Sequence, residues 1–439
     1  MAESMAESPA CDAGASTATH SSRHVDLVVK LGGAAITHKG SEVEHLNEPV
    51  LRSVAQTIAQ TIQELRTEGR CPNVVVVHGA GSFGHQFAKQ YGVASGGNGT
   101  LRVGTDDSSN RRLRLGIAKT RASVCRLNSL VVAALVDAGV NAVGMSPYGG
   151  WWTRDGGKTL DLARTKPAID SLRRTVDAGL VAVVHGDVVL DSKSDCAILS
   201  GDTIVRQLCF DLKPKRAVFV TDVPGIFDKP PPKPNGGKRK RSAKNSETLS
   251  LLREVCLDAS VSGNNDDPWH ATRVAVGVTI ADDGGVIFPE TTGTVENGIV
   301  AGKTITSATV ELASGAAGVA DVTGGIAGKM REAARVASLG VDVYVSNALR
   351  DGSAAAIRGR VDRDTLLVAQ DTLDLVLDGN GEKPRPWFGT LVRGVKIHEC
   401  DAIATEARGC DKHELTAEKA RKRGVEGRLS ACLRNVVST

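Results

Sequence analysis

Short apolar runs alternate with amphipathic stretches along most of the chain. Short, largely apolar runs rich in valine lie at 25–30, 74–78, 139–144, 180–185, 216–221 and 341–346. Such runs are typical of strands that are covered on both faces. Helical patterns lie between them, notably at 49–67 and 116–137, and Pro49 suits the first turn of a helix. This alternation predicts an α/β fold in which helices cover both faces of a mostly parallel sheet.

Polar segments mark the beginning of the chain, two insertions and its end. Residues 1–24 have no apolar core, so we interpret them as a disordered tail, with an organelle-targeting peptide as the alternative. Residues 95–112 predict a polar, glycine-rich loop. Residues 229–248 predict a disordered insertion, because a proline run meets a basic cluster there. Residues 393–439 are charged, and we expect them to be partly helical without a clear strand.

The basic cluster KRKR at 238–241 has more than one interpretation. It suits a nuclear localisation signal, a nucleic-acid contact or a solvated loop. We favour the loop because no aromatic residues lie among the charges. A net charge of +4 on 439 residues is also too small to indicate binding to nucleic acid or membranes.

Composition narrows the class of protein further. Hydrophobic residues make up 41% of the chain and charged residues 24%, as in ordinary globular proteins. No apolar run approaches the roughly 20 residues of a membrane span. The nine cysteines are scattered and form no C-x-x-C pair, which disfavours a zinc site or a disulfide framework. We therefore expect a reduced compartment, the cytoplasm.

The first predicted strand runs into a glycine turn with lysines on both sides. Lys30 ends the strand, Gly32, Gly33 and Ala34 follow, and Lys39 is close behind. Glycines let backbone N–H groups approach an anion without interference from a Cβ atom. The spacing matches neither G-x-x-x-x-G-K-[ST] nor G-x-G-x-x-G, which disfavours a dinucleotide-dependent oxidoreductase.

The second predicted strand leads into HGAGSFGH, residues 78–85. Its glycines permit a nest of N–H donors, and a helix beginning near His85 adds its positive end. From this segment alone, His85 is either a donor to a phosphate oxygen or a helix-start residue packed on Phe83 or Tyr91.

Three later strand ends add further candidates. Asp202 precedes a helical run, so it either caps that helix or orients nearby lysines. Asp222 precedes a proline–glycine turn and either caps it or accepts bonds from ligand hydroxyls. Gly325 and Lys329 belong to DVTGGIAGK, a flexible loop or a phosphate-binding turn. In open parallel sheets ligands bind at the carboxyl ends of strands. Lysines, a histidine and glycine turns at one such edge are what phosphoryl transfer requires.

These segments together resemble a known family. KLGGAAITHK, HGAGSFGH, ILSGDTI, VTDVPGIFD and DVTGGIAGKM occur in the order seen in the amino acid kinase superfamily, and the histidine closing G-x-G-S-F-G-H resembles the isopentenyl phosphate kinases within it. The resemblance covers roughly residues 25–350, and GTLV at 389–392 resembles the family's closing strand. It implies an αβα sandwich, with an acceptor-binding half at 25–206 and an ATP-binding half at 207–392.

The resemblance also implies a reaction and roles for single residues. ATP, with Mg²⁺, would phosphorylate isopentenyl phosphate to isopentenyl diphosphate in isoprenoid biosynthesis, and the protein would be a homodimer. Lys39 would stabilise the transferring phosphoryl group and Asp202 would orient the lysines. The expected ATP contacts are Lys30, Gly32, Gly33, Ala34, Gly81, Asp222, Gly325 and Lys329. The expected acceptor contacts are Ala80, His85 and Gly201.

Two departures and several alternatives stay open at this point. Ala34 stands where many relatives have serine, and Ala80 replaces a frequent glycine. A kinase of the same fold acting on another small phosphate, a phosphonate such as fosfomycin, or a carboxylate is the main alternative, and a non-catalytic nucleotide-binding sensor is a weaker one. The apolar part of the acceptor would meet the helix near 116–135 or residues 143–147.

Overall fold

The computed structural model describes the parts of the chain that form the sheet and its helices: residues 25–38, 43–70, 72–97, 108–223, 225–227, 250–258, 272–280, 286–287, 332–348, 352–359, 361 and 389–395. Lys39, Gly325, Lys329, the tail at 1–24, the insertion at 229–248 and residues 396–439 lie outside the described residues.

All six predicted strands are neighbours in one sheet and run parallel. In spatial order they are β14 (Asp342–Asn347), β9 (Arg216–Thr221), β1 (Leu27–Leu31), β2 (Val74–His78), β6 (Val181–His185) and β3 (Ala142–Met145). Each pair in this series is parallel. The predicted mostly parallel sheet is therefore confirmed.

An antiparallel region extends the sheet beyond β14. It contains β15 (Gly389–Val395), β11 (Ser250–Asp258), β12 (Thr272–Ile280), β13 (Val286–Ile287) and β10 (Ile226–Phe227), which pairs with β11. β15 runs antiparallel to β14 and parallel to β11. The strand expected at 389–392 is present. It continues to Val395, so the expectation of no strand from residue 393 onward was wrong for its first three residues.

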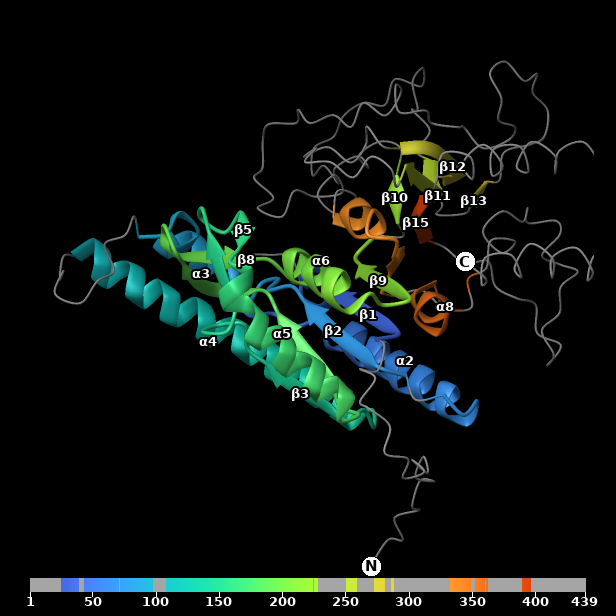
Figure 1. The fold of residues 1–439 in the computed structure, drawn as a ribbon, viewed down its shortest axis with the longest axis horizontal. Coiled ribbons are helices and arrows are strands. Elements are labelled where there is room, and N and C mark those ends of the chain that lie inside the picture. Colours follow the sequence, from blue (N-terminus) through green and yellow to red (C-terminus); the bar gives the residue numbers. More distant parts are fainter. Residues whose placement is uncertain are drawn as a thin grey trace, which may run out of the picture.

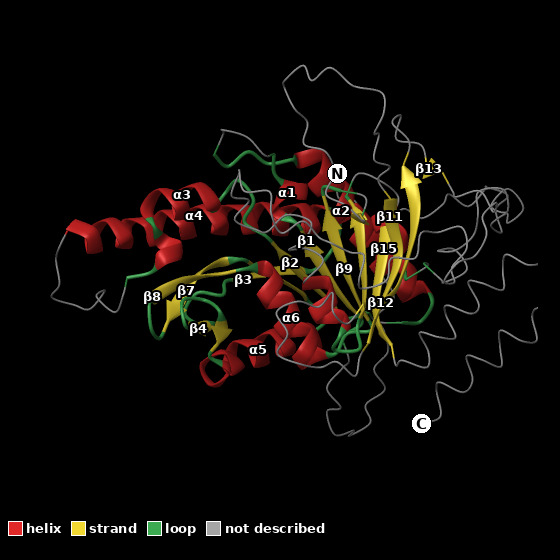
Figure 2. Ribbon diagram, turned by 90° about the horizontal axis from the view of Figure 1, so that it is seen from above, coloured by secondary structure: helices red, strands yellow, loops and turns green. Residues whose placement is uncertain are grey.

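Helices cover both faces of the sheet, as predicted (Figure 2). α2 (Glu48–Thr67), α4 (Ser108–Asp137) and α8 (Gly352–Arg358) share one core cluster with alternate strand residues such as Val29. α5 (Leu162–Asp177), α6 (Gly201–Leu212) and helical residues 332–337 share the other cluster with Val28. Since Val28 and Val29 are both fully buried, the unbroken apolar run reflects burial on two faces.

The long helix α4 begins earlier than its apolar pattern suggested. The loop predicted at 95–112 is helical from Ser108 onward, and a short 3₁₀ helix, η1 (Val93–Ser95), precedes it. Asn110 and Leu113 are buried while Arg111 and Arg112 are exposed, so the charged residues form the outer face at the start of the helix. Polar composition therefore concealed an amphipathic helix start.

A second, small sheet lies beside α3 (His85–Tyr91), away from the antiparallel region (Figure 1). Its strands, in the order β5-β4-β7-β8, are β5 (Thr159–Leu160), β4 (Trp152–Arg154), β7 (Asp187–Asp191) and β8 (Asp195–Leu199). Asp191 ties its turns together, because its carboxylate accepts bonds from Thr153 Oγ1 (2.8 Å) and the Ser194 amide (2.7 Å).

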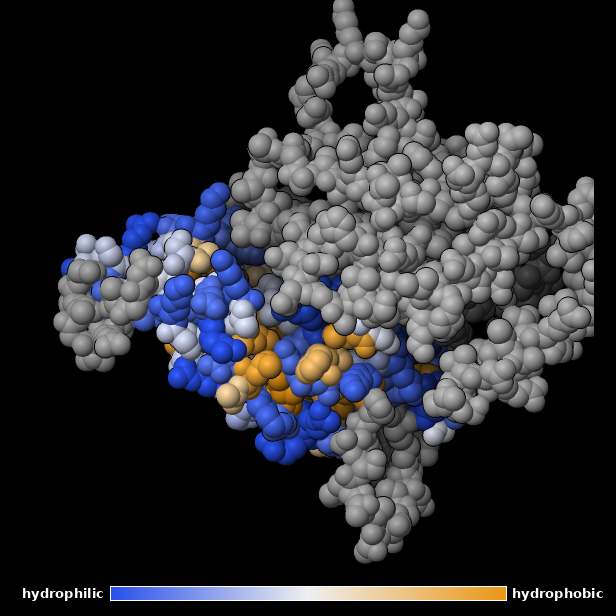
Figure 3. All heavy atoms as spheres, turned by 45° about the horizontal axis from the view of Figure 1, so that its top comes forward, coloured by the Kyte–Doolittle hydropathy of each residue, from blue (hydrophilic) through white to orange (hydrophobic). Residues whose placement is uncertain are grey.

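Hydrophilic side chains cover most of the described surface that Figure 3 shows, with some hydrophobic groups among them. The large exposed hydrophobic residues of the described part include Leu130, Val136 and Phe210, on α4 and α6. Single exposed apolar residues are common on protein surfaces, so they identify no partner by themselves. Among the described residues, no helix is both long enough and apolar enough to cross a membrane.

Candidate active site

The carboxyl ends of β9, β1, β2 and β6 lie at one edge of the sheet, because these four strands are parallel neighbours. β1 leads into Gly32 and Gly33, and the short helix α1 (Gly33–Ile36) starts there. β2 leads into HGAGSFGH, and α3 starts at His85, where the sequence predicted a helix. The structure therefore brings the first two glycine turns to the same edge.

These two glycine turns, at 32–33 and 79–81, are in direct backbone contact. A Cβ atom on Gly33 would lie 2.3 Å from the amide nitrogen of Gly81, and one on Gly79 would lie 2.9 Å from the nitrogen of Gly33. Gly81 also has a φ of +54°. Side chains at these positions would force the turns apart, so the glycines permit the close approach itself.

Several backbone amides of the two turns are available to a ligand. Gly32 N donates to Val220 O (2.8 Å) and Gly79 N donates to Leu31 O (3.0 Å), which hold the turns on the sheet. The amides of Gly33, Ala34, Ala80 and Gly81 donate no hydrogen bond to other described residues. Amides clustered in this way suit an anion; all four residues were expected to bind ATP or the acceptor.

Lys30 and Asp202 form an ion pair beside these turns, although they are 172 residues apart in the sequence. Lys30 is only 8% exposed, and its ammonium lies 5.0 Å from the centre of the Phe219 ring. Ser200 caps α6 instead of Asp202, accepting from the Thr203 amide (3.1 Å). Asp202 is therefore paired with a lysine and is not the cap of α6, and its role in orienting the lysines stays a prediction.

Of the predicted acceptor residues, Ala80 and Gly201 lie at the end of β2, and His85 begins the helix that follows the same turn. Gly201 starts α6, and a Cβ atom on it would lie 3.3 Å from His78 O. His85 is half-buried, and its ring forms neither a hydrogen bond nor a ring contact with the other described residues. Phe83 belongs to the core, and the Tyr91 ring instead meets Arg112 and Lys119. Both interpretations of His85, packing and binding, stay predictions.

Asp222 follows the last residue of β9 and is half-buried. It lies at the same sheet edge as Gly32, because Gly32 N bonds to Val220 O and its Cβ position is 3.7 Å from Thr221 Cα. The remaining nucleotide-side candidates, Gly325 and Lys329, are outside the described residues, as is Lys39.

Sequence reasoning missed a pair of buried histidines beneath the glycine turns. His78 and His185 end β2 and β6 and stack with ring centroids 5.5 Å apart. His78 Nδ1 donates to Gly79 O (3.1 Å) and Nε2 accepts from Asn128 Nδ2 (3.1 Å). Burial lowers the pKa of His78 to about 3 and that of His185 to about 4, so both rings are neutral. The sequence signal that could have revealed the pair is that each histidine ends an apolar run, and two such runs can be neighbouring strands.

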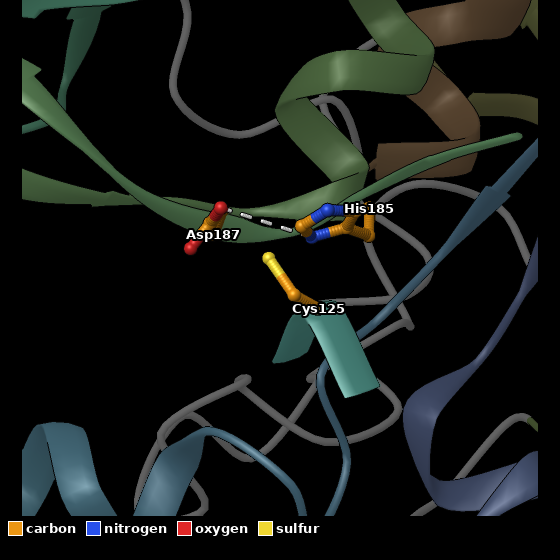
Figure 4. Close-up of side chains that lie close together, drawn as sticks. All are labelled: Cys125, His185 and Asp187. Carbon is orange, nitrogen blue, oxygen red and sulfur yellow. Dashed lines mark ion pairs between the residues drawn. The ribbon is translucent and has the colours of Figure 1, made fainter. Parts of the chain in front are cut away.

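Next to this pair, Cys125, His185 and Asp187 point toward one another (Figure 4), with ligand atoms within 4.8 Å of each other. The guanidinium of Arg121 lies 3.9 Å from Asp187 Oδ2 and 3.7 Å from Cys125 Sγ. A fixed cation in contact with two of the three ligands opposes metal binding. We therefore interpret the cluster as a buried polar network. Burial raises the pKa of Asp187 to about 7, although Arg121 acts in the opposite direction.

A shallow cavity of about 330 Å³ lies between α3, α4 and the segment before α2. It is lined by Val43, Glu44, Phe87, Lys119, Ala122, Ser123 and Arg126. Helix α4 contributes to it, whereas residues 143–147 do not. A separate apolar cluster, which contains Ala88, Val93, Leu113, Val188 and Cys196, packs between α3, α4 and the small sheet.

Comparison with known proteins identifies the family to which this chain belongs. The amino acid kinase family matches residues 27–254. Isopentenyl phosphate kinase from Arabidopsis thaliana is 30% identical over 405 residues, which cover 85% of this chain and 96% of that protein. The enzyme of that name from Methanothermobacter thermautotrophicus is 34% identical over 212 residues, 47% of this chain and 71% of the relative. A solved isopentenyl phosphate kinase structure has a TM-score of 0.46 at 24% identity, covering 76% of this chain and 96% of that one. The family match and the near full-length relative show that this chain belongs to the amino acid kinase family.

Proposed function

We propose that this protein is an isopentenyl phosphate kinase, which transfers the γ-phosphoryl group of ATP to isopentenyl phosphate and releases ADP. Two relatives of that name, one similar over 85% of this chain, support the proposal. The observation that carries it is the sheet edge itself: a buried lysine, paired with Asp202, stands beside two touching glycine turns with available amides.

The chemistry needs positioning and positive charge and requires no covalent intermediate on the protein. An oxygen of the acceptor phosphate attacks the γ-phosphorus, and the bond from that phosphorus to the β,γ-bridging oxygen breaks, leaving its electrons on ADP. The acceptor oxygen is already anionic, so no general base is required. Lys30 and the turn amides offset the negative charge that develops, and Lys39 would do the same.

His85 is the group that we propose for the acceptor phosphate. It stands at the first position of α3, where the helix dipole adds positive potential, and its ring has no partner among the described residues. Ala88 is three residues further along and therefore on the same face of the helix. Because Ala88 belongs to the apolar cluster, one helix face joins the proposed phosphate donor to apolar side chains.

Mg²⁺ would accompany ATP. In nucleotide sites Mg²⁺ usually takes one or two protein carboxylates and otherwise binds phosphate oxygens and water. Asp202 and Asp222 are carboxylates at this sheet edge, which fits that requirement, although Asp202 also holds Lys30. When bound, the ion would neutralise phosphate charge, while the residues described above hold and orient the substrates.

The division into an acceptor half at 25–206 and a nucleotide half at 207–392 belongs to the same proposal, as do a homodimer and a cytoplasmic location. The acceptor half contains α3, α4, the small sheet and the apolar cluster. Cys125, Cys196 and Cys209, which the structure describes, are free thiols, and this suits a reduced compartment.

A coupled ADP-release assay tests the function. Isopentenyl phosphate, dimethylallyl phosphate, longer isoprenoid monophosphates and fosfomycin would be compared as acceptors. We expect turnover with isopentenyl phosphate, and turnover with fosfomycin alone would reassign the substrate. His85→Ala should lower kcat and raise the KM for the acceptor, so that kcat/KM falls by about 10- to 100-fold. An effect of this size is expected because the lost hydrogen bond would be charge-assisted. Gln86→Ala, at the next half-buried position of α3, is the matched control. Unchanged turnover in His85→Ala would remove His85 from the site.

A further inference from the structure

The segment that joins α1 to α2 contains a strained residue close to the proposed site. Glu44 has a φ of +63°, a left-handed conformation that side chains with a Cβ adopt only at a cost. Such strain persists where surrounding contacts hold it and often marks a functional position. Lys39 lies between Glu44 and the first glycine turn in the sequence.

Backbone and hydroxyl contacts fix both ends of this segment to the HGAGSFGH turn. Glu44 N donates to Ser82 O (3.2 Å), and His45 N donates to Ser82 Oγ (3.1 Å). At the other end, Ser82 N donates to Thr37 Oγ1 (3.0 Å). Thr37 and Leu46 also pair as an isolated β-bridge. Ser82 is therefore bonded to residues on both sides of Lys39 in the sequence.

A long-range ion pair holds the same segment to α4. Arg126 Nη1 contacts Glu44 Oε2, and the two residues are 82 positions apart. Arg126 is followed by Leu127, which is fully buried, so its backbone belongs to a rigid part of α4. The pair stands at the edge of the 330 Å³ cavity, and the Arg126 side chain is 56% exposed. Exposed ion pairs contribute little to overall stability.

We propose that Glu44 and Arg126 are positioning residues for phosphoryl transfer: their ion pair, together with the bonds of Glu44 and His45 to Ser82, holds the second glycine turn in register with α4. The inference rests on the proposed function. In its left-handed conformation Glu44 makes both the backbone bond to Ser82 and the ion pair with Arg126. As positioning residues they would act through Ser82, so their effect should appear in turnover and not in the KM for ATP.

Four variants test this arrangement. Arg126→Ala removes the cation, Arg126→Lys restores it, and Glu44→Gly relieves the strained φ while removing the carboxylate. Arg52→Ala is the control, because it breaks the exposed pair Arg52–Glu48 on α2, away from the site. We expect Arg126→Ala and Glu44→Gly to lower kcat about 10-fold, with less than a twofold change in the KM for ATP, since misplacement by a fraction of an ångström slows chemistry. Arg126→Lys should recover most of the loss, and Arg52→Ala should match the wild type.

Hydrogen exchange provides a second reading that does not depend on the substrate. The amides of Glu44, His45 and Ser82 should exchange faster in Arg126→Ala and remain protected in Arg52→Ala. If the wild type does not phosphorylate isopentenyl phosphate, the proposed function fails. The hydrogen-exchange rates of these amides then show by themselves whether the ion pair holds the segment. If the wild type is active but Arg126→Ala keeps its kcat and amide protection, the positioning role is overturned.

Discussion

Gly33 is the residue at which the two glycine turns meet, and its replacement by alanine tests the proposed site most directly. The new Cβ would lie 2.3 Å from the Gly81 nitrogen and 2.7 Å from its Cα, and both of these are backbone atoms that cannot rotate away. Ordinary contact begins at 3.4 Å, so the turns would have to separate by about 1.1 Å. A displacement of about 1 Å at a reacting centre can lower the rate by about 100-fold, equivalent to about 2.7 kcal/mol in the barrier.

The assay is steady-state ADP release at saturating ATP, together with thermal unfolding of the same samples. Gly69→Ala is the control, because no atom lies within 4 Å of the Cβ position of Gly69; unlike Gly33, Gly69 has a positive φ (+73°), so alanine meets backbone strain there without a clash. We expect Gly69→Ala to lose about 1 kcal/mol of stability and keep its kcat. Gly33→Ala should lose most of its activity even at temperatures where it is folded. A folded Gly33→Ala variant with wild-type kcat would refute the argument that contact between the turns organises the site.

Two further predictions concern the buried charged and titratable groups. Near pH 5 the two histidines are neutral in the folded protein, where the pKa is about 3 for His78 and about 4 for His185, but protonated in the unfolded chain. Asp187 behaves in the opposite way: it is protonated in the folded protein, where its pKa is about 7, and ionised in the unfolded chain. The unfolded chain then binds a net one proton more, so stability should fall by about 1.4 kcal/mol per pH unit as the pH drops from 6 to 4. Asp187→Asn removes the opposing group and should steepen the slope to about 2.7 kcal/mol per unit; urea unfolding at several pH values measures both slopes, and an unchanged slope would contradict the assignment. Asp202→Asn leaves the buried Lys30 ammonium without its carboxylate, so we expect a stability loss of roughly 1–3 kcal/mol and a lower kcat, with Asp170→Asn, in an exposed pair with Lys166, as the unaffected control.

The sequence by itself determined the parallel sheet, because the signal for each strand is local. A run such as Val74–Val77 is apolar at every position, and a strand buries all of these side chains only when both of its faces are covered. The same logic located the glycine turns and the start of α3 at His85, since a turn or a helix start depends on a few adjacent residues. The amphipathic start of α4 at Ser108 was missed because its outward residues are polar. The small sheet was missed because β5 and β4 have only two and three residues, and because β7 and β8 each begin with an aspartate and so lack an unbroken apolar run.

Only the tertiary structure decided which groups meet at the sheet edge. Asp202 had a capping alternative until the fold placed it on Lys30 and Ser200 took over the cap. The stack of His78 on His185 depends on the register of β2 with β6, and the contact of Arg126 with Glu44 depends on how α4 crosses the segment before α2. These contacts join residues that are distant in the sequence, so no local pattern encodes them. They arise because burial of the two core clusters fixes strand order and helix position, and the polar groups then pair with whatever that packing places beside them.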